Sequence, residues 1–283
     1  MIKRIFITFL GLFVGYNLFL MLVKPSWGEY TQRDRNINKV EQVGLDDQPD
    51  WDVVIVGSSI AARLNILKDK KVLNLSLEGE GALTGLGILK QSGLKPALIA
   101  IETNALYLAQ DQGVMDVNEF AWRNAIKQYL PALQNKNKPS VLVSPLIFYQ
   151  GKAQKVYQGV ANGLKAALPD KPIKSSPQVG RRGDHQNAKS KIDHLKLDTI
   201  LLKKYLDYFE KAKVKVVFFN MPAGCLEAHQ HMEKSVRQSF QKSILIPSVD
   251  CSAYATTDGV HLNAKESAKY SSYLTQHLAS YLK

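Results

Sequence analysis

The stretch WDVVIVGSS, residues 51–59, decides how the rest of the chain is interpreted. It is a short, continuous run rich in β-branched residues that ends at a glycine, which is typical of a strand buried on both faces of a parallel sheet. Four further runs have a similar character: KVLNLSLEG (71–79), PALIAIETN (96–104), PSVLVSPLIF (139–148) and VKVVFFNMP (214–222). The sequence therefore predicts a sheet of five strands.

Helical patterns separate these strands and close the chain. They are SIAARLNILK (59–68), TGLGILKQSG (84–93), NEFAWRNAIKQYLPALQ (118–134), LDTILLKKYLDYFEKAK (197–213) and SAKYSSYLTQHLASYL (267–282). Strands that alternate with helices predict an α/β fold, here a three-layer α/β/α sandwich around a parallel sheet. Ligands of such sheets bind beyond the carboxyl ends of the strands, so polar residues at those ends are the candidate site residues.

Residues 1–26 predict a membrane anchor. Lys3 and Arg4 precede about nineteen uncharged residues, which is long enough for a helix to span the hydrocarbon core of a bilayer. A cleaved signal peptide and a buried helix of a soluble protein are the alternatives, but the run is long for a signal peptide and no A-x-A-like site follows. We expect a single-pass anchor in the cytoplasmic (inner) membrane, with the chain after Lys24 facing the periplasm or the cell exterior.

The rest of the chain is expected to contain a linker and one domain. Residues 27–50 are polar and lack sustained apolar periodicity, which is typical of a linker or of a loosely attached strap. Residues 51–283 are enough for one domain with a sizeable core. Within this domain, residues 150–195 are rich in Lys, Arg, Pro, Ser and Gly and predict a basic insertion outside the sheet.

The chain of 283 residues has a formal net charge of +12. A basic protein can bind nucleic acid, but an exported domain rarely meets it, and the sequence has no zinc-finger, helix-turn-helix or RNP-like signature. We expect no nucleic-acid partner. An anionic polysaccharide, a cell-wall polymer or a phospholipid headgroup is a more natural partner, and the alternative is a surface charge that only favours solubility.

Two cysteines fit a protein that is exported to an oxidising compartment. Cys225 follows the predicted strand 214–222, and Cys251 follows SILIPSVD, which could be the neighbouring strand, so a disulfide between them is expected. Two small buried apolar side chains are the alternative. His229 and His231 could bind a metal, but no third ligand accompanies them at a suitable spacing, and we expect no metal site.

Small or polar residues follow three of the predicted strands. Ser58 and Ser59 lie at the first strand-to-helix turn, where the N-terminus of a helix would favour a developing anion. Gly79 follows the second strand, where backbone can approach a substrate without a Cβ. Asn104 follows the third strand and offers an amide donor. Each residue alone has an ordinary explanation as a helix cap or a turn residue.

Asp258 and His261 lie three residues apart in TTDGVHLN, residues 256–263, close enough to form a base with its orienting carboxylate. The segment GEGALTGLG (79–87) suits neither a P-loop, since no Lys-Ser/Thr follows, nor a dinucleotide site, since its third glycine comes one residue late. The order Ser, Gly, Asn, then Asp-x-x-His therefore favours a catalytic site over unrelated turns.

This order resembles the SGNH (GDSL-type) hydrolase family, whose four sequence blocks contribute Ser, Gly, Asn and His. VVIVGSSIA, NLSLEGEG, IAIETNAL and TTDGVHLN are similar to the four blocks, and the resemblance covers residues 51–107 and 214–275. It implies a flavodoxin-like fold and no metal or cofactor. It also implies a catalytic Ser59, His261 and Asp258, and an oxyanion hole formed by the N–H groups of Ser59 and Gly79 with the Asn104 side chain.

Two blocks depart from the family pattern. The usual Gly-Asp-Ser is Gly-Ser-Ser here, as occurs in membrane-anchored acyl-transfer branches of the family. The usual Gly-x-Asn-Asp is Glu-Thr-Asn-Ala, which keeps Asn104 but alters the loop around it. The second change concerns the shape of the oxyanion loop and not the amide donor itself.

The resemblance implies that Ser59 attacks an ester carbonyl after His261 takes its proton. Water then completes hydrolysis, or a sugar hydroxyl completes acyl transfer. We expect a serine esterase or O-acyltransferase that acts on O-acyl, chiefly acetyl, esters of a cell-envelope or extracellular glycan, together with partner proteins of an envelope polysaccharide pathway. The alternatives are a lipid esterase or thioesterase, and a non-catalytic subunit of a polysaccharide assembly or acylation machine.

Overall fold

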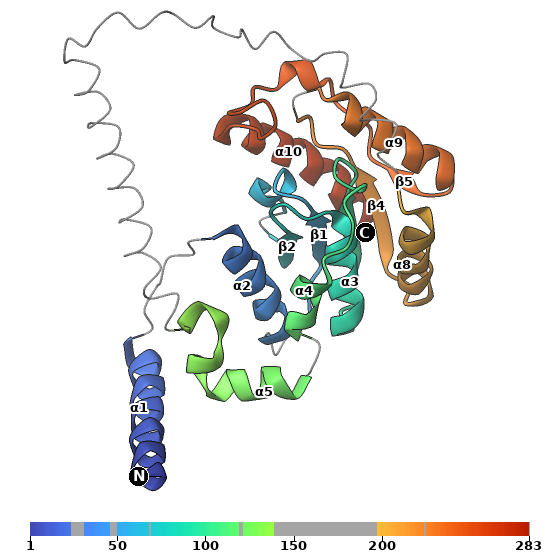
Figure 1. Ribbon diagram of the computed structural model, residues 1–283. Helices are drawn as coiled ribbons and strands as arrows, with labels where there is room; N and C mark the ends of the chain where they lie inside the picture. The colour runs from blue at the N-terminus through green and yellow to red at the C-terminus, as the bar shows by residue number, and fades with distance from the viewer. Residues whose placement is uncertain are drawn as a thin grey trace, which may run out of the picture.

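The computed structural model describes residues 1–23, 31–45, 50–67, 69–118, 121–138, 197–223 and 225–282. A five-stranded parallel sheet with strand order β2-β1-β3-β4-β5 lies at its centre (Figure 1). The strands are β1 (Val53–Gly57), β2 (Val72–Ser76), β3 (Leu98–Glu102), β4 (Lys215–Phe219) and β5 (Ile244–Leu245). The predicted α/β class and the parallel five-stranded sheet are confirmed.

Four of the five predicted strands, 51–59, 71–79, 96–104 and 214–222, contain β1, β2, β3 and β4. The predicted strand 139–148 and the predicted basic insertion at 150–195 lie outside the described residues. The fifth strand of the described sheet is β5, a short edge strand within SILIPSVD that pairs with β4, as the sequence suggested for this segment.

The two faces of the sheet belong to two separate hydrophobic clusters. Val54 and Val56 of β1 join a cluster with residues of helices α3 (Ala82–Ser92), α8 (Thr199–Lys211) and α9 (Glu227–Ser239). Val53 and Ile55 join a second cluster, which contains residues of helix α10 (Ala264–Tyr281). All five residues of β1 are buried, as the continuous apolar run predicted.

Helix α1 (Ile2–Val23) is the only helix of the described residues that is long and apolar enough to cross a membrane. Most of its apolar side chains are exposed, and Asn17 and Leu20 are buried against the rest of the protein. The predicted N-terminal apolar helix is therefore present.

Within the predicted linker 27–50, residues Gln32–Leu45 form helix α2. Val40 and Val43 of this helix enter the hydrophobic core. Polar side chains of α2 also bond the end of β2 and the segment that follows it.

The helix predicted over residues 59–68 is a single 3₁₀ turn, η1 (Ala61–Arg63), after which the backbone is extended at Leu64. The Asn74 amide of β2 donates to the carbonyl groups of Ala61, Ala62 and Leu64, and so competes with the bonds that would continue a helix. Ser59 therefore does not lie at the N-terminus of a helix.

The remaining elements are short. Helix α5 (Ala121–Tyr129) ends before Pro131, and the 3₁₀ turns η3 (Pro131–Leu133) and η4 (Asn135–Asn137) follow it. Helix α4 (Gln112–Met115) and turn η2 (Asp116–Asn118) precede α5, and turn η5 (Cys251–Ala253) precedes the segment TTDGVHLN.

Candidate active site

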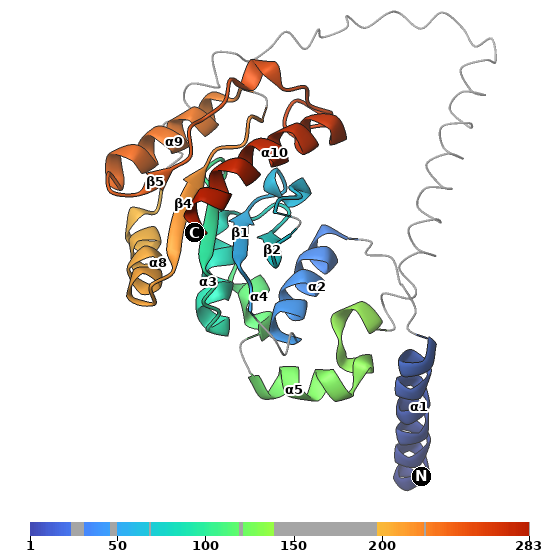
Figure 2. The same ribbon diagram turned by 180° about the vertical axis from the view of Figure 1, so that it is seen from behind.

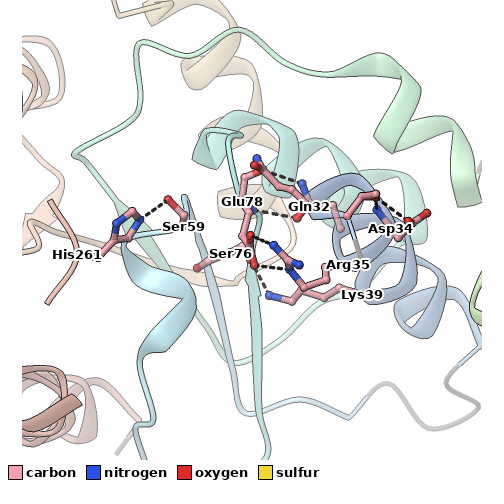
Figure 3. A network of polar contacts seen from close by, with 10 residues as sticks. Gln32, Asp34, Arg35, Lys39, Ser59, Ser76, Glu78 and His261 are labelled. Carbon is pink, nitrogen blue, oxygen red and sulfur yellow. Dashed lines mark hydrogen bonds and ion pairs between the residues drawn. The ribbon is translucent and has the colours of Figure 1, made fainter. Parts of the chain in front are cut away.

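Ser59, His261 and Asp258 form a continuous chain of hydrogen bonds. The Ser59 Oγ lies 3.0 Å from Nε2 of His261, although the two residues are 202 positions apart in the sequence (Figure 3). The Nδ1 of the same imidazole lies 2.7 Å from the Oδ2 of Asp258. The structure thus brings the three predicted catalytic residues together at the carboxyl end of β1, in the arrangement of a nucleophile, a base and an orienting carboxylate.

Hydrogen bonds within the loop of Asp258 and His261 hold its conformation. The Oδ1 of Asp258 accepts the backbone N–H groups of His261 at 2.8 Å and Val260 at 3.0 Å. Gly259 has a φ of +84°, so the turn uses the left-handed region that glycine adopts without strain. The Thr257 N–H donates to the His261 carbonyl at 2.8 Å, which closes the loop.

These contacts determine which nitrogen of His261 carries a proton beside Asp258. The His261 backbone N–H, the His261 side chain and the Val260 N–H hold the pKa of Asp258 far below its usual range. Because an ionised carboxylate can only accept hydrogen bonds, Nδ1 of His261 carries the proton that faces it. When the imidazole is neutral, its Nε2 is therefore an acceptor for the Ser59 hydroxyl.

Ser58, the neighbour of Ser59, is buried and contacts Glu102. Its N–H donates to Oε2 of Glu102 at 2.6 Å, and its hydroxyl lies 3.0 and 3.1 Å from the two carboxyl oxygens of Glu102. The Glu102 side chain is fully buried, and burial raises its pKa to about 7. Gly57 makes this contact possible, because a Cβ at position 57 would lie 2.4 Å from Glu102 Oε2.

Glu102 was not among the residues that the sequence singled out. It lies where the resembled family has the glycine of its third block, and its only signal in the sequence is a carboxyl residue inside an otherwise apolar strand. Its contacts with Ser58 make it a support for the turn that presents Ser59.

Two of the three predicted oxyanion donors lie at the cavity. Gly79, with a φ of +74°, lines the same cavity as Ser59. Within the described part of the chain, neither the Ser59 N–H nor the Gly79 N–H has a hydrogen-bond acceptor. Both N–H groups thus stay candidate oxyanion donors.

The predicted role of Asn104 as an oxyanion donor is not supported. Its side chain is fully buried, its nitrogen donates to the Met221 carbonyl at 2.9 Å, and its oxygen accepts the Met221 N–H at 2.7 Å. Asn104 does not line the cavity. The amide instead ties the end of β3 to the segment that follows β4.

The cavity beside Ser59 has a volume of about 710 Å³. All the residues that line it except Ala62 and Gly79 have polar side chains. They come from three parts of the chain: Gln32, Arg35, Asn36, Lys39 and Gln42 of α2; Ser59, Ala62, Arg63, Glu78 and Gly79 around β1 and β2; and Asp258 and His261. The α2 wall belongs to the segment that the sequence predicted as a linker.

Glu78 is the point at which α2 joins the domain. The Arg35 guanidinium bonds both carboxyl oxygens of Glu78, at 2.8 and 2.5 Å (Figure 3). The Asn36 side chain exchanges two hydrogen bonds with the Glu78 backbone, at 2.8 and 2.9 Å, and the Gln32 amide also donates to the Glu78 carbonyl. The bond from Arg35 is the chief reason that the pKa of Glu78 is lowered. These contacts fix α2 beside Ser59.

No protein-family model, curated protein or solved structure matches this chain. Any function assigned to the site therefore depends on the contacts among its own residues.

Cys225 and Cys251 form a disulfide. The bridge joins the segment after β4 to turn η5, a few residues before the loop of Asp258 and His261. Among the described residues, no three His, Cys, Asp or Glu side chains gather as a metal site requires. His229 is buried with Nδ1 3.2 Å from the Ala223 carbonyl, and burial lowers its pKa.

Proposed function

We propose that this protein is a serine-dependent esterase or O-acyltransferase of the SGNH type. The observation that carries the proposal is the chain of hydrogen bonds from Ser59 to His261 to Asp258 beside a polar cavity. The strand order 2-1-3-4-5 is that of flavodoxin-like sheets, and we extend the proposal to a three-layer fold of that kind.

The geometry supports acyl transfer through a covalent intermediate. His261 Nε2 takes the Ser59 proton while Oγ attacks the ester carbonyl carbon, and the carbonyl π electrons move onto oxygen. The N–H groups of Ser59 and Gly79 bind this oxyanion. As the oxyanion collapses, the bond to the alcohol breaks, and the imidazolium of His261 returns the proton to the leaving oxygen. Water or a second hydroxyl then attacks the acyl-enzyme by the reverse sequence.

The cavity favours a glycan ester over a lipid ester. Its walls present amide, guanidinium and ammonium groups, which suit sugar hydroxyls, whereas a lipid esterase or thioesterase needs a wide apolar acyl pocket. Arg35, Lys39 and Arg63 also suit a polymer that carries negative charge. We therefore propose an O-acyl, chiefly acetyl, ester of a cell-envelope or extracellular glycan as the substrate.

We further propose that α1 anchors the enzyme in the cytoplasmic membrane and that its domain faces the periplasm or the cell exterior. Lys3 and Arg4 before the apolar run support this orientation, as does the Cys225–Cys251 disulfide, because such bridges persist in oxidising compartments. A reporter fused after Lys283 that is active only in the cytoplasm would contradict the orientation.

A fluorophosphonate probe tests the assignment of the nucleophile. We expect the detergent-solubilised full chain to be labelled and Ser59→Ala not to be labelled. Ser58→Ala is the matched control: it removes a neighbouring hydroxyl whose partner is the buried Glu102, so labelling should persist. Labelling of Ser59→Ala would refute Ser59 as the nucleophile, and an unlabelled, folded wild-type protein would favour the non-catalytic subunit. Faster turnover of long-chain esters than of acetyl esters would favour the lipid esterase.

A further inference from the structure

Helix α5 turns its polar side towards the protein and its apolar side outwards. Asn124 is buried, and the Lys127 ammonium lies 2.6 Å from Oε1 of Glu41, a side chain that is only 3% exposed. On the other side, Trp122, Ile126 and Tyr129 follow one another at intervals of four and three residues and are 60%, 41% and 75% exposed. A surface helix of a soluble protein has the opposite arrangement.

A further exposed apolar side chain follows α5. Leu133 of η3 is 40% exposed. Soluble monomers seldom expose a contiguous apolar stripe that contains both Trp and Tyr, so this surface indicates an apolar environment or partner.

Helix α1 identifies that environment. The Tyr16 hydroxyl donates to the Asn137 carbonyl at 2.6 Å, and the Asn17 side chain accepts the Ala132 N–H at 3.0 Å. These two α1 residues lie six and seven positions before Val23, which places the contact roughly 10 Å before the end of the helix. In both views α5 runs across the direction of α1, level with its C-terminal part (Figures 1 and 2).

We propose that Trp122, Ile126, Tyr129 and Leu133 form a membrane seat, which enters the headgroup–acyl boundary of the bilayer that α1 spans. An α5 helix that runs across α1 at this depth lies along the membrane surface. Trp and Tyr are the residues enriched at this boundary. Exposed Arg123, Lys136 and Lys138 lie close in sequence to the membrane seat and suit anionic headgroups.

The membrane seat is joined to the catalytic cavity through α2. On one side of α2, Glu41 accepts the Asn135 N–H at 2.8 Å, and Asn38 accepts the Asn135 amide at 2.8 Å. On the other side, Arg35 and Lys39 line the cavity. The same helix therefore contacts the membrane-facing segment and forms a wall of the site, which holds the cavity at a fixed height above the bilayer. This inference does not depend on the proposed esterase chemistry.

Environment-sensitive dyes on the full chain in nanodiscs test the membrane seat. Tyr129→Cys places a dye on the seat, and Ile200→Cys, an 84%-exposed apolar position of α8, is the matched control. The native cysteines are joined in a disulfide and do not react without reductant. The discs contain phosphatidylcholine and phosphatidylglycerol, with or without a lipid that carries a nitroxide near its headgroup.

We expect blue-shifted emission from the dye at position 129 and its loss in discs with the nitroxide lipid, while the dye at position 200 keeps its emission. Equal loss at both positions, or no loss at either, would overturn the proposal. A dye at position 129 that escapes the lipid quencher and is quenched by a second labelled copy in the same disc would overturn it in favour of a protein–protein contact.

Discussion

The buried carboxyl of Glu102 makes the stability of this protein depend on pH, and one substitution isolates the effect. Burial raises the pKa of Glu102 to about 7 from 4.5 in the unfolded chain, although hydrogen bonds from the Ser58 N–H, the Ser58 hydroxyl and the Ala61 N–H oppose the rise. The folded protein therefore keeps this proton over a pH range in which the unfolded chain releases it. Between pH 4.5 and about 7 the free energy of unfolding should fall as pH rises, and above that range this group contributes no further change.

The size of the effect follows from the interval between the two pKa values. At about 1.36 kcal/mol per pH unit, the interval is worth roughly 3 kcal/mol. Glu102→Gln keeps the shape and one acceptor oxygen but removes the titration. The free energy of unfolding of Glu102→Gln, relative to that of the wild-type protein, should therefore rise by roughly 3 kcal/mol from about pH 4.5 to about pH 7.5.

Urea unfolding followed by circular dichroism measures this difference, with both proteins in the same detergent so that α1 contributes equally. Other titrating groups cancel in the comparison. Glu227→Gln, which removes an exposed carboxyl in the first turn of α9, is the matched control and should leave the wild-type curve unchanged. Curves for wild type and Glu102→Gln that run parallel across the whole range would refute the reasoning.

Three further experiments test the site and the stability of the fold. Asp258→Asn should lower turnover on an aryl acetate by about 10²-fold, because Asn favours the wrong imidazole tautomer, while the melting temperature stays close to that of wild type; a full rate would reduce Asp258 to a turn residue. Gly79→Ala and Gly93→Ala both place a Cβ at positive φ, at a cost of about 1 kcal/mol, but only at position 79 would the Cβ meet an α2 side chain, so only that variant should also lose activity. Equal activity of the two glycine variants would contradict this placement. Replacing both Cys225 and Cys251 by Ala opens a loop with a sequence separation of 26, which should cost roughly 3 kcal/mol of stability by chain entropy; an unchanged urea midpoint would show that the bridge contributes nothing.

The sheet and the triad could be predicted because each depends on a strong local signal. The strand at Val53–Gly57 is buried on both faces, so its residue types alone reveal it. Asp258 and His261 are three residues apart, so their contact is local. The contact of Ser59 with His261 spans 202 positions, yet it follows from the rule that sites form beyond the carboxyl ends of parallel strands.

The features that the sequence did not predict depend on long-range polar contacts. Arg35 and Asn36 of α2 donate hydrogen bonds to Glu78, and the periodicity of apolar residues does not predict such contacts. The missing helix after Ser59 depends on the Asn74 side chain of another strand. The side-chain amide of Asn104 exchanges two hydrogen bonds with the backbone of Met221, and no sequence pattern near Asn104 predicts this partner.

These differences change which residues form the candidate site. With Glu102 bound to Ser58 and Asn104 bound to Met221, the end of β3 holds neighbouring backbone in place and contributes no donor to the cavity. Of the predicted donor residues, Ser59 and Gly79 line the cavity, together with side chains of α2 and Arg63. Helix α2 lies in the sequence between the apolar helix α1 and Trp51, the first residue of the predicted domain. A chain that began at Trp51 would keep Ser59, His261 and Asp258 but would lose the wall of the cavity that α2 forms, so α2 belongs to the candidate site.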